Sequence, residues 1–221
     1  MSIYLNKLLT DNDEINAELR SRSKKIIEQT IRHKDKEILC EKVEVELKDG
    51  WKVAKENKQS IRMAKDKPMS DQLEDELWTI LARMGFNEMS YGNDFKIHVG
   101  TNVNPRQIDV FAKDNETAIM VECTCCETPK KKNMSTLIEK IESFKGKMAT
   151  SIKSHYEGNQ KLKLRWVIAT RNIEWGPADL EKAKAAKIWV LRDSEINYYR
   201  KLTTHLKSAA KYQFLAHLFS N

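Results

Sequence analysis

The sequence predicts an α/β fold in which helices flank a mixed central β-sheet. Two observations support this prediction. Between residues 70 and 200, apolar segments with helical or strand periodicity follow the order helix–β–β–β–helix–β–helix–β. This order is typical of a sheet that carries helices on both faces. Within the series, the stretch 106–126 holds two apolar runs joined by a short polar turn, which predicts a tight hairpin.

The chain divides by these patterns into three parts. Residues 1–66 are predicted to be an extension containing a helix over 13–34 and a hairpin that begins with the alternating strand 42–47. Residues 70–200 form the predicted core. A long helix over 194–221 follows, because its apolar residues recur at helical spacing without Gly or Pro.

The core elements follow from local signals. A helix is predicted over 72–85, since its apolar residues share one face and Gly85 ends it. The alternating stretch 95–99 predicts a strand, and the apolar stripe of 134–156 predicts a long helix. The remaining elements are a strand over 164–171, a helix over 177–187 with Pro near its start, and a strand over 188–191.

Composition restricts the class of protein. The chain has 221 residues, of which 40% are hydrophobic, enough for a packed core. No apolar run approaches the length of a membrane span, and the N-terminus lacks the pattern of a signal peptide, so we expect a cytoplasmic protein without a membrane partner. The formal charge of +7 favours a polyanionic partner such as DNA.

Each strand of the predicted hairpin carries one acidic residue within an apolar run, Asp109 in the first strand and Glu122 in the second. If Asn115–Glu116 is a two-residue loop, directly paired positions sum to 231. Asp109 then faces Glu122 with Cβ atoms about 5 Å apart. A loop at Asp114–Asn115 makes the pair diagonal but keeps it on one face, whereas a three-residue loop would separate the faces.

Two buried carboxylates this close repel each other and are costly to desolvate. A hard divalent cation such as Mg²⁺ or Mn²⁺, which prefers oxygen ligands, relieves the repulsion. Asp109 and Glu122 are therefore candidate ligands of a metal ion.

This arrangement resembles the core of the PD-(D/E)xK, or restriction-endonuclease-like, nucleases. In that family a strand-borne Asp and the Glu of an E-x-K triplet hold the catalytic metal. Asp109 matches the Asp and Glu122 the Glu, while Thr124 stands where the Lys is expected. The segment 73–86 resembles the first core helix of the Mrr-like branch, in which Glu74 matches a usual acidic residue. The resemblance covers roughly residues 70–200.

The resemblance implies a Mg²⁺- or Mn²⁺-dependent phosphodiesterase in which the carbonyl of Cys123 completes the metal coordination. Thr124 can exchange a hydrogen bond but cannot supply the charge of a lysine. Two explanations are open. The charge could come from Lys140 or from the basic loop Lys130, Lys131 and Lys132; alternatively the site is degenerate and binds DNA or regulates a partner without cutting.

Two candidate groups have an ordinary alternative. Glu74 is either a site residue or an exposed first-turn Glu that suits the helix dipole. The loop Lys130–Lys132 either contacts phosphates or is a solvated charge run.

The apolar face of the last helix needs a cover. It packs on the core, pairs with a second copy in a homodimer, or awaits a further domain. A weaker likeness to the N-terminal region of DGQHR-domain proteins rests on residues 50–58, the L-E-D-E-L-W stretch and the last helix.

Three functional classes follow from the sequence. The first is a metal-dependent DNA endonuclease of restriction or phage-defence type. The second is a degenerate nuclease-fold module, and the third is an interaction domain whose carboxylates are structural.

Overall fold

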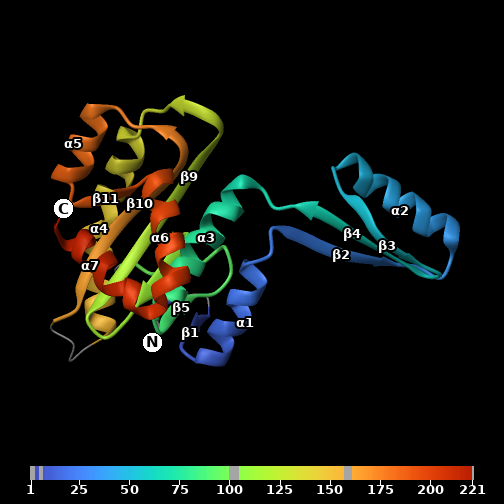
Figure 1. Cartoon of the computed structure of the whole chain (residues 1–221), viewed down its shortest axis with the longest axis horizontal. Helices are drawn as coiled ribbons and strands as arrows, with labels where there is room; N and C mark the ends of the chain where they lie inside the picture. Colours follow the sequence, from blue (N-terminus) through green and yellow to red (C-terminus); the bar gives the residue numbers. More distant parts are fainter. Residues whose placement is uncertain (1–2, 5–6, 100–104, 157–160, 221) are drawn as a thin grey trace. The chain divides into compact units, whose positions relative to one another are not determined.

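The computed structural model describes residues 3–4, 7–99, 105–156 and 161–220. The chain forms two compact units (Figure 1). Unit 1 comprises Met1–Ser23 and Met69–Asn221, and unit 2 comprises Lys24–Pro68. No helix in the described part of the chain is long and apolar enough to cross a membrane.

Unit 1 is built on a six-stranded mixed sheet with the order β1-β5-β8-β9-β10-β11. The pairs from β1 to β9 are antiparallel, whereas β9–β10 and β10–β11 are parallel. The strands are β1 (Leu8–Leu9), β5 (Glu88–Ser90), β8 (Val110–Lys113), β9 (Thr117–Lys131), β10 (Lys163–Glu174) and β11 (Ile188–Leu191).

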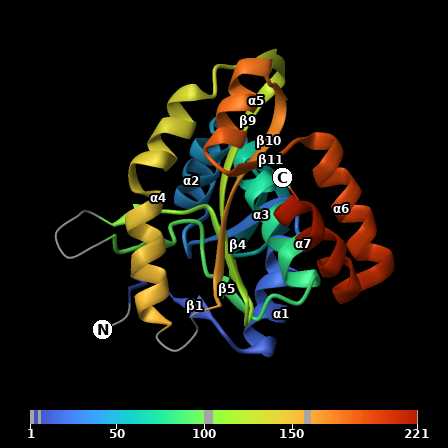
Figure 2. The same ribbon diagram turned by 90° about the vertical axis from the view of Figure 1, so that its left-hand side faces the viewer.

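Helices cover both faces of this sheet, which confirms the predicted fold class (Figure 2). One face packs against α4 (Ser135–His155) and α5 (Pro177–Ala185). The other face packs against α3 (Met69–Arg83) and the C-terminal helices, with α1 (Asn12–Arg22) beside α3.

The first 23 residues do not belong to a separate extension, as the sequence had suggested for the whole of 1–66. Helix α1 buries Ile15 in the same apolar cluster as α3. Its last residue, Arg22, is buried, donates to Asp75 at 2.8 Å and stacks over Trp78 at 5.1 Å. A buried cation with such partners ties α1 to the core.

The predicted hairpin and its register are confirmed. Val110 pairs with Val121 and Lys113 with Ala118, so paired positions sum to 231. The Asp114 N–H donates to the Thr117 carbonyl at 2.9 Å and closes the two-residue loop.

The prediction of a core strand over 95–99 is corrected. Lys96–Ile97 (β6) pairs with Arg106–Gln107 (β7) in a separate two-stranded sheet. The central sheet instead recruits β5 beside β8. Strand β5 has only three residues and no alternating pattern, and it is held by tertiary contacts such as the Phe111 N–H donating to Ser90 Oγ at 3.1 Å.

The C-terminal segment is helical as predicted but is divided in two. Helix α6 (Asp193–Leu206) and helix α7 (Ala210–Ser220) are joined by a short 3₁₀ turn, η1 (Lys207–Ala209), where Lys207 has a φ of 50°. The break lets both apolar faces reach the sheet, and the buried cluster there includes residues of both helices. The apolar face that suggested a homodimer is thus covered within unit 1.

Unit 2 is a three-stranded antiparallel sheet with the order β2-β4-β3 and one helix. Helix α2 packs Leu39 and Val43 against Ile61 and Met63 of β4. The elements are β2 (Ile26–Arg32), α2 (Lys36–Lys48), β3 (Lys52–Asn57) and β4 (Ser60–Asp66).

Two predictions in this region are wrong. The helix expected over 13–34 ends at Arg22, and its second half is the strand β2, which is rich in β-branched Ile. The strand expected over 42–47 lies within helix α2, because Leu39 and Val43 are four residues apart and bury one helical face. Asp35 caps that helix by accepting from the Glu37 N–H at 2.8 Å.

Candidate active site

The structure brings Asp109 and Glu122 together, as the hairpin register predicts. Asp109 directly precedes β8, and its Oδ2 accepts from the backbone N–H of Cys123 at 2.6 Å. Glu122 lies in β9 one residue beyond the last ladder pair and is only 7% exposed. Its Oε1 atom is buried and has no hydrogen-bond partner among the residues that the structure describes. The buried apolar residues next to them in β8 and β9 fix the positions of both carboxylates on the sheet.

Burial dominates the electrostatics of these two acids. It raises the pKa of Glu122 to about 7, and the nearby charge of Asp109 adds to this rise while Lys140 opposes it. Burial also raises the pKa of Asp109, against the opposing effects of the Cys123 N–H and Lys140. The site therefore favours a bound proton or cation over two free negative charges.

Lys140 is close to this pair. It lies in the second turn of α4, and its Nζ atom is 3.8 Å from Glu122 Oε2. The Lys140 side chain is 56% exposed, so its ammonium group faces solvent beside the buried carboxylate. In the structure Lys140 thus lies near the two acids, as its place in the helix after the hairpin had suggested.

Lys132 contacts Thr124, a contact that sequence reasoning missed. Lys132 Nζ donates to Thr124 Oγ1 at 2.9 Å. In an extended strand Thr124 shares a face with Glu122, because the two are two residues apart. An ammonium group therefore lies next to the residue that replaces the expected lysine.

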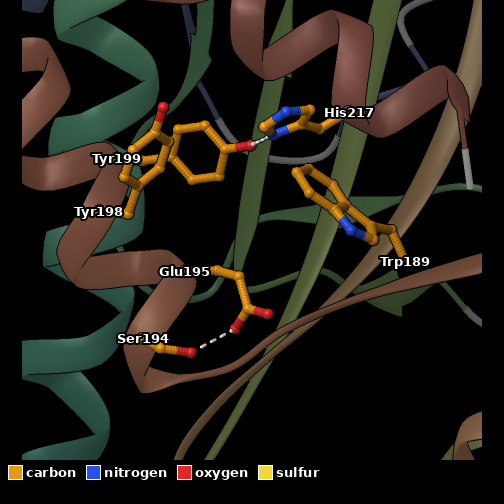
Figure 3. A pocket seen from close by; sticks show the side chains of 6 residues that line it. All are labelled: Trp189, Ser194, Glu195, Tyr198, Tyr199 and His217. Atoms are coloured by element: carbon orange, nitrogen blue, oxygen red, sulfur yellow. Dashed lines mark hydrogen bonds between the residues drawn. The ribbon is translucent and has the colours of Figure 1, made fainter.

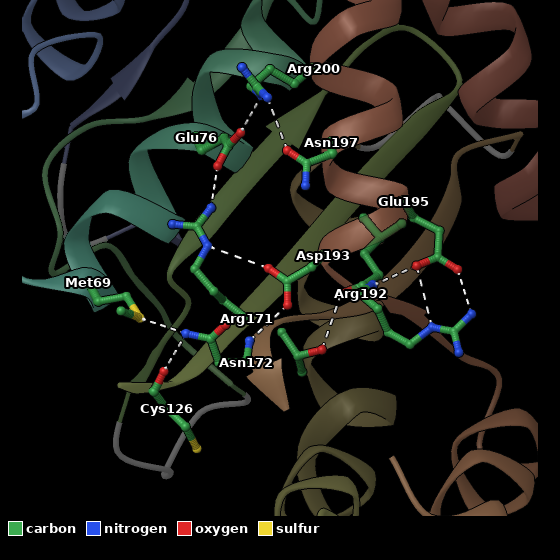
Figure 4. A network of polar contacts seen from close by, with 12 residues as sticks. Met69, Glu76, Cys126, Arg171, Asn172, Arg192, Asp193, Glu195, Asn197 and Arg200 are labelled. Carbon is green, nitrogen blue, oxygen red and sulfur yellow. Dashed lines mark hydrogen bonds and ion pairs between the residues drawn. The ribbon is translucent and has the colours of Figure 1, made fainter. Parts of the chain in front are cut away.

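A bulge in β9 brings Lys132 back toward Thr124. Between the pairs Arg171–Cys125 and Ile173–Lys130, β9 advances five residues while β10 advances two. Asn172 holds the bulge, because its Nδ2 donates to the carbonyl of Cys126 at 3.0 Å (Figure 4) and to the carbonyl of Glu127 at 3.3 Å. No local pattern in the sequence predicts this bulge.

Lys130 and Lys131 are the last two residues of strand β9, whereas Lys132 follows the strand. The sequence had suggested one basic loop, but β9 continues to Lys131. Lys130 pairs with Ile173 and Lys131 with Glu174, and both side chains are exposed.

Glu74 is half-buried on α3, which packs on the sheet face opposite α4. Burial, followed by the charges of Asp109 and Asp71, raises its pKa to about 8. Asp109, which directly precedes β8, is thus one of the charges that act on Glu74. This environment favours the site interpretation of Glu74 over an exposed first-turn Glu.

A polar network anchors the helix that carries Glu74. Glu76 of α3 lies between Arg171 of β10 and Arg200 of α6, with Arg200 Nε 3.1 Å from Glu76 Oε1 (Figure 4). Asp193 accepts from the Asn172 N–H at 2.8 Å and lies 3.7 Å from Arg171. The network joins α3 and α6 to the C-terminal part of β10.

The residues fit a Mg²⁺ or Mn²⁺ ion. Two adjacent carboxylates supply the hard ligands that Mg²⁺ prefers, and one of them has a buried oxygen that no described residue bonds. The Cys123 thiol is unsuited, since burial raises its pKa well above the usual range, and the backbone carbonyl is the donor that the resemblance assigns. The described residues contain no cluster of three His, Cys, Asp or Glu side chains placed to hold a metal, so water or substrate oxygens would have to complete the shell.

A hollow of about 420 Å³ lies at β11, α6 and α7, away from the two carboxylates (Figure 3). Its acidic group is already satisfied, because Glu195 accepts from Arg192 at 2.7 Å and from Ser194 at 2.9 Å. Tyr199 Oη and His217 Nδ1 share a hydrogen bond of 2.5 Å. These contacts join α6 to α7 and cap α6, which is a structural role.

The titration of Glu122 predicts a pH-dependent stability in the presence of EDTA. Its folded-state pKa of about 7 lies above the unfolded value of 4.5, so the folded protein binds this proton more tightly. The stability is fully present below pH 4.5 and is lost as the pH rises through 7. For Glu122 alone the loss is about 3 kcal/mol. Urea unfolding at pH 5 and pH 8 measures it, and equal free energies of unfolding for the protein and Glu122→Gln at both pH values would contradict it.

No family model matches the chain, and no curated protein matches it. Among solved structures, protein VC1899 from Vibrio cholerae is similar with a TM-score of 0.41 and 12% identity, over 91% of this chain and 53% of that one. Can2 from Sulfobacillus thermosulfidooxidans, solved in complex with cyclic tetra-adenylate, has a TM-score of 0.43 and 12% identity, over 91% of this chain and 57% of that one. The chain spans a little over half the length of each.

Proposed function

We propose that this protein is a metal-dependent DNA endonuclease that hydrolyses phosphodiester bonds, of the restriction or phage-defence type. The observation that carries the proposal is the pair Asp109 and Glu122, in which a buried carboxylate oxygen has no partner in the described part of the chain. Such an oxygen is costly in a folded protein unless it serves a ligand. Lys140, 3.8 Å from Glu122, adds a positive charge where a phosphate would lie.

In this proposal Asp109, Glu122 and the Cys123 carbonyl hold the metal ion. When bound, Mg²⁺ would neutralise the phosphate and lower the pKa of a water ligand. The Cys123 N–H fixes the orientation of Asp109 through the bond at 2.6 Å. Glu74, with a pKa of about 8, is mainly protonated at pH 7 and can donate a hydrogen bond near Asp109.

The lysines take the role that the E-x-K lysine has in the family. Lys140 can stabilise the developing charge on the phosphate beside Glu122. Thr124 Oγ1 accepts from Lys132, which leaves the hydroxyl hydrogen free to be donated to a water or phosphate oxygen. The exposed Lys130 and Lys131 extend the positive charge along the same strand and suit DNA phosphates.

A degenerate DNA-binding module is the second candidate. The same contact of 3.8 Å favours it, because the Lys140 ammonium can neutralise Glu122 in place of a metal ion. In that case the carboxylates would be structural and the domain would act by binding.

The test is a plasmid-nicking assay. The purified chain is incubated with supercoiled plasmid and Mg²⁺, Mn²⁺ or EDTA, next to Asp109→Ala and the matched control Glu116→Ala in the exposed hairpin loop. We expect metal-dependent nicking by the protein and by Glu116→Ala, and none by Asp109→Ala. Salt-sensitive DNA binding without nicking would instead support the degenerate module.

A further inference from the structure

We propose that the open face of the unit 2 sheet is a docking surface for duplex DNA, separate from the carboxylate site. Unit 2 covers only one face of its sheet, since Ile61 and Met63 of β4 are buried against α2. The alternate residues of the same strands point to the opposite face. The inference takes DNA as partner from the proposed function, but it does not require cleavage.

The strand register defines this open face. Arg62 of β4 pairs directly with Thr30 of β2 and Lys55 of β3. Directly paired residues share a face, so these three side chains form one row across the sheet. Neighbouring rows on the same face are Arg32, Ser60 and Asn57 on one side, and Glu28, Ala64 and Lys52 on the other.

The charge of the face is mainly positive. Its cations are Arg32, Lys52, Lys55 and Arg62, and all four side chains are exposed. Glu28 and Asp66 on the same face offset two of them, and Glu28 forms an exposed pair with Arg62 at 3.7 Å. Such a solvent-exposed pair is weak and can be exchanged for a phosphate. The exposed side of α2 is different, because it mixes lysines with a larger number of glutamates.

A basic hollow continues the face at one end. It has a volume of about 780 Å³ and shares Arg32 and Ser60 with the open face. The residues that line it are Arg32, His33, Lys34, Asp35, Gln59 and Ser60. Three basic side chains beside amide and hydroxyl donors suit phosphate oxygens.

Shape and chemistry together favour duplex DNA over other polyanions. The major groove of B-DNA admits a two-stranded β-ribbon, such as the β3–β4 pair that carries Lys52, Lys55 and Arg62, whereas the deep, narrow major groove of an RNA duplex does not. Arginine, asparagine and threonine on such a ribbon can bond base edges, and lysines can bond phosphates.

The experiment measures binding of the full chain to a fluorescent DNA duplex in EDTA, so that cleavage plays no part. The triple variant Arg32→Ala, Lys55→Ala, Arg62→Ala removes three charges from the open face. The control Lys36→Ala, Lys42→Ala, Lys48→Ala removes three exposed charges from α2 of the same unit. Both variants are first checked for a thermal melt like that of the unmodified protein.

We expect the open-face variant to bind DNA at least about tenfold more weakly and to lower the slope of log affinity against log salt by about 3. The α2 variant should stay within about twofold of the unmodified protein. Should the open-face variant melt differently, the exposed β3 pair Lys52→Glu, Lys55→Glu is tested in its place.

Equal losses in the open-face and α2 variants would overturn the proposal, because net charge rather than this face would then set affinity. Tighter binding of duplex RNA than of duplex DNA would also overturn it. Failure of the proposed function would give a different result. If the unmodified chain does not nick plasmid with Mg²⁺, but only the open-face variant loses DNA binding, the docking surface is supported and the nuclease activity is not.

Discussion

Replacing Glu122 by Gln is expected to abolish Mg²⁺-dependent nicking while it stabilises the metal-free protein. The amide keeps the size of the side chain but removes the buried charge whose burial raises the pKa of Glu122 to about 7. At pH 8 this relief amounts to a gain of up to about 3 kcal/mol in the free energy of unfolding. Activity should fall by at least about 10³, because a neutral amide is a poor ligand for a hard cation.

Urea unfolding in EDTA and plasmid nicking in Mg²⁺ measure the two effects on one preparation. Glu116→Gln is the matched control, since it makes the same change at an exposed position of the same hairpin. Both its stability and its nicking should remain those of the unmodified chain. A Glu122→Gln protein that is less stable in EDTA at pH 8 would show that the carboxylate is structural.

Addition of Mg²⁺ separates the two proposed functions. A ligand that binds only the folded state raises the free energy of unfolding, by about 2.7 kcal/mol at a concentration of 100 Kd. The protein should therefore melt at a higher temperature in Mg²⁺ at pH 8, and Glu122→Gln should not. If Lys140 already neutralises Glu122, Mg²⁺ will leave both melting temperatures unchanged.

Removal of the two lysines at the site is expected to slow nicking strongly. Lys140→Ala and Lys132→Ala should each lower the rate by roughly 10²–10³, the range for loss of one electrostatic contact to a transition state. Lys140 acts directly beside Glu122, and Lys132 acts through Thr124. Lys153→Ala is the matched control, because it removes an exposed lysine from the last turn of the helix that carries Lys140 and should change the rate less than about fivefold.

A rescue variant tests the assignment of Lys132 to the missing charge. Thr124→Lys places a lysine at the position that the family motif uses, and it should restore nicking in the Lys132→Ala background. Quantified nicking rates at fixed Mg²⁺ measure this recovery. If Thr124→Lys does not raise the rate of Lys132→Ala, the contact at 2.9 Å only holds the bulge in place.

Much of the core could be predicted from the sequence because its signals are local. The two-residue loop at Asn115–Glu116 sets the register of the two strands that it joins, and the register places Asp109 opposite Glu122. The apolar stripe of α4 likewise put Lys140 on a helix next to the hairpin. The family resemblance then supplied Glu74, whose half-buried setting the structure describes.

Unit 2 shows where local pattern fails. The alternation in 42–47 indicated a strand, but Leu39 and Val43 bury one helical face against β4, and this packing decides the outcome. Segments of this length hold valid patterns of both periods, and only the neighbouring surface selects one. The same holds for β5, which is too short to carry a pattern and pairs with β8 through Glu88 and Met89.

The sequence by itself determined the α/β class, the hairpin and the meeting of Asp109 with Glu122, because these depend on residues near each other along the chain. Only the tertiary structure decided that Lys132 reaches Thr124, since this requires the β9 bulge held by Asn172 of another strand. It also decided that the last helix breaks at Lys207 and covers its own sheet. Contacts between distant segments leave no periodic pattern in the sequence, so only the folded structure reveals them.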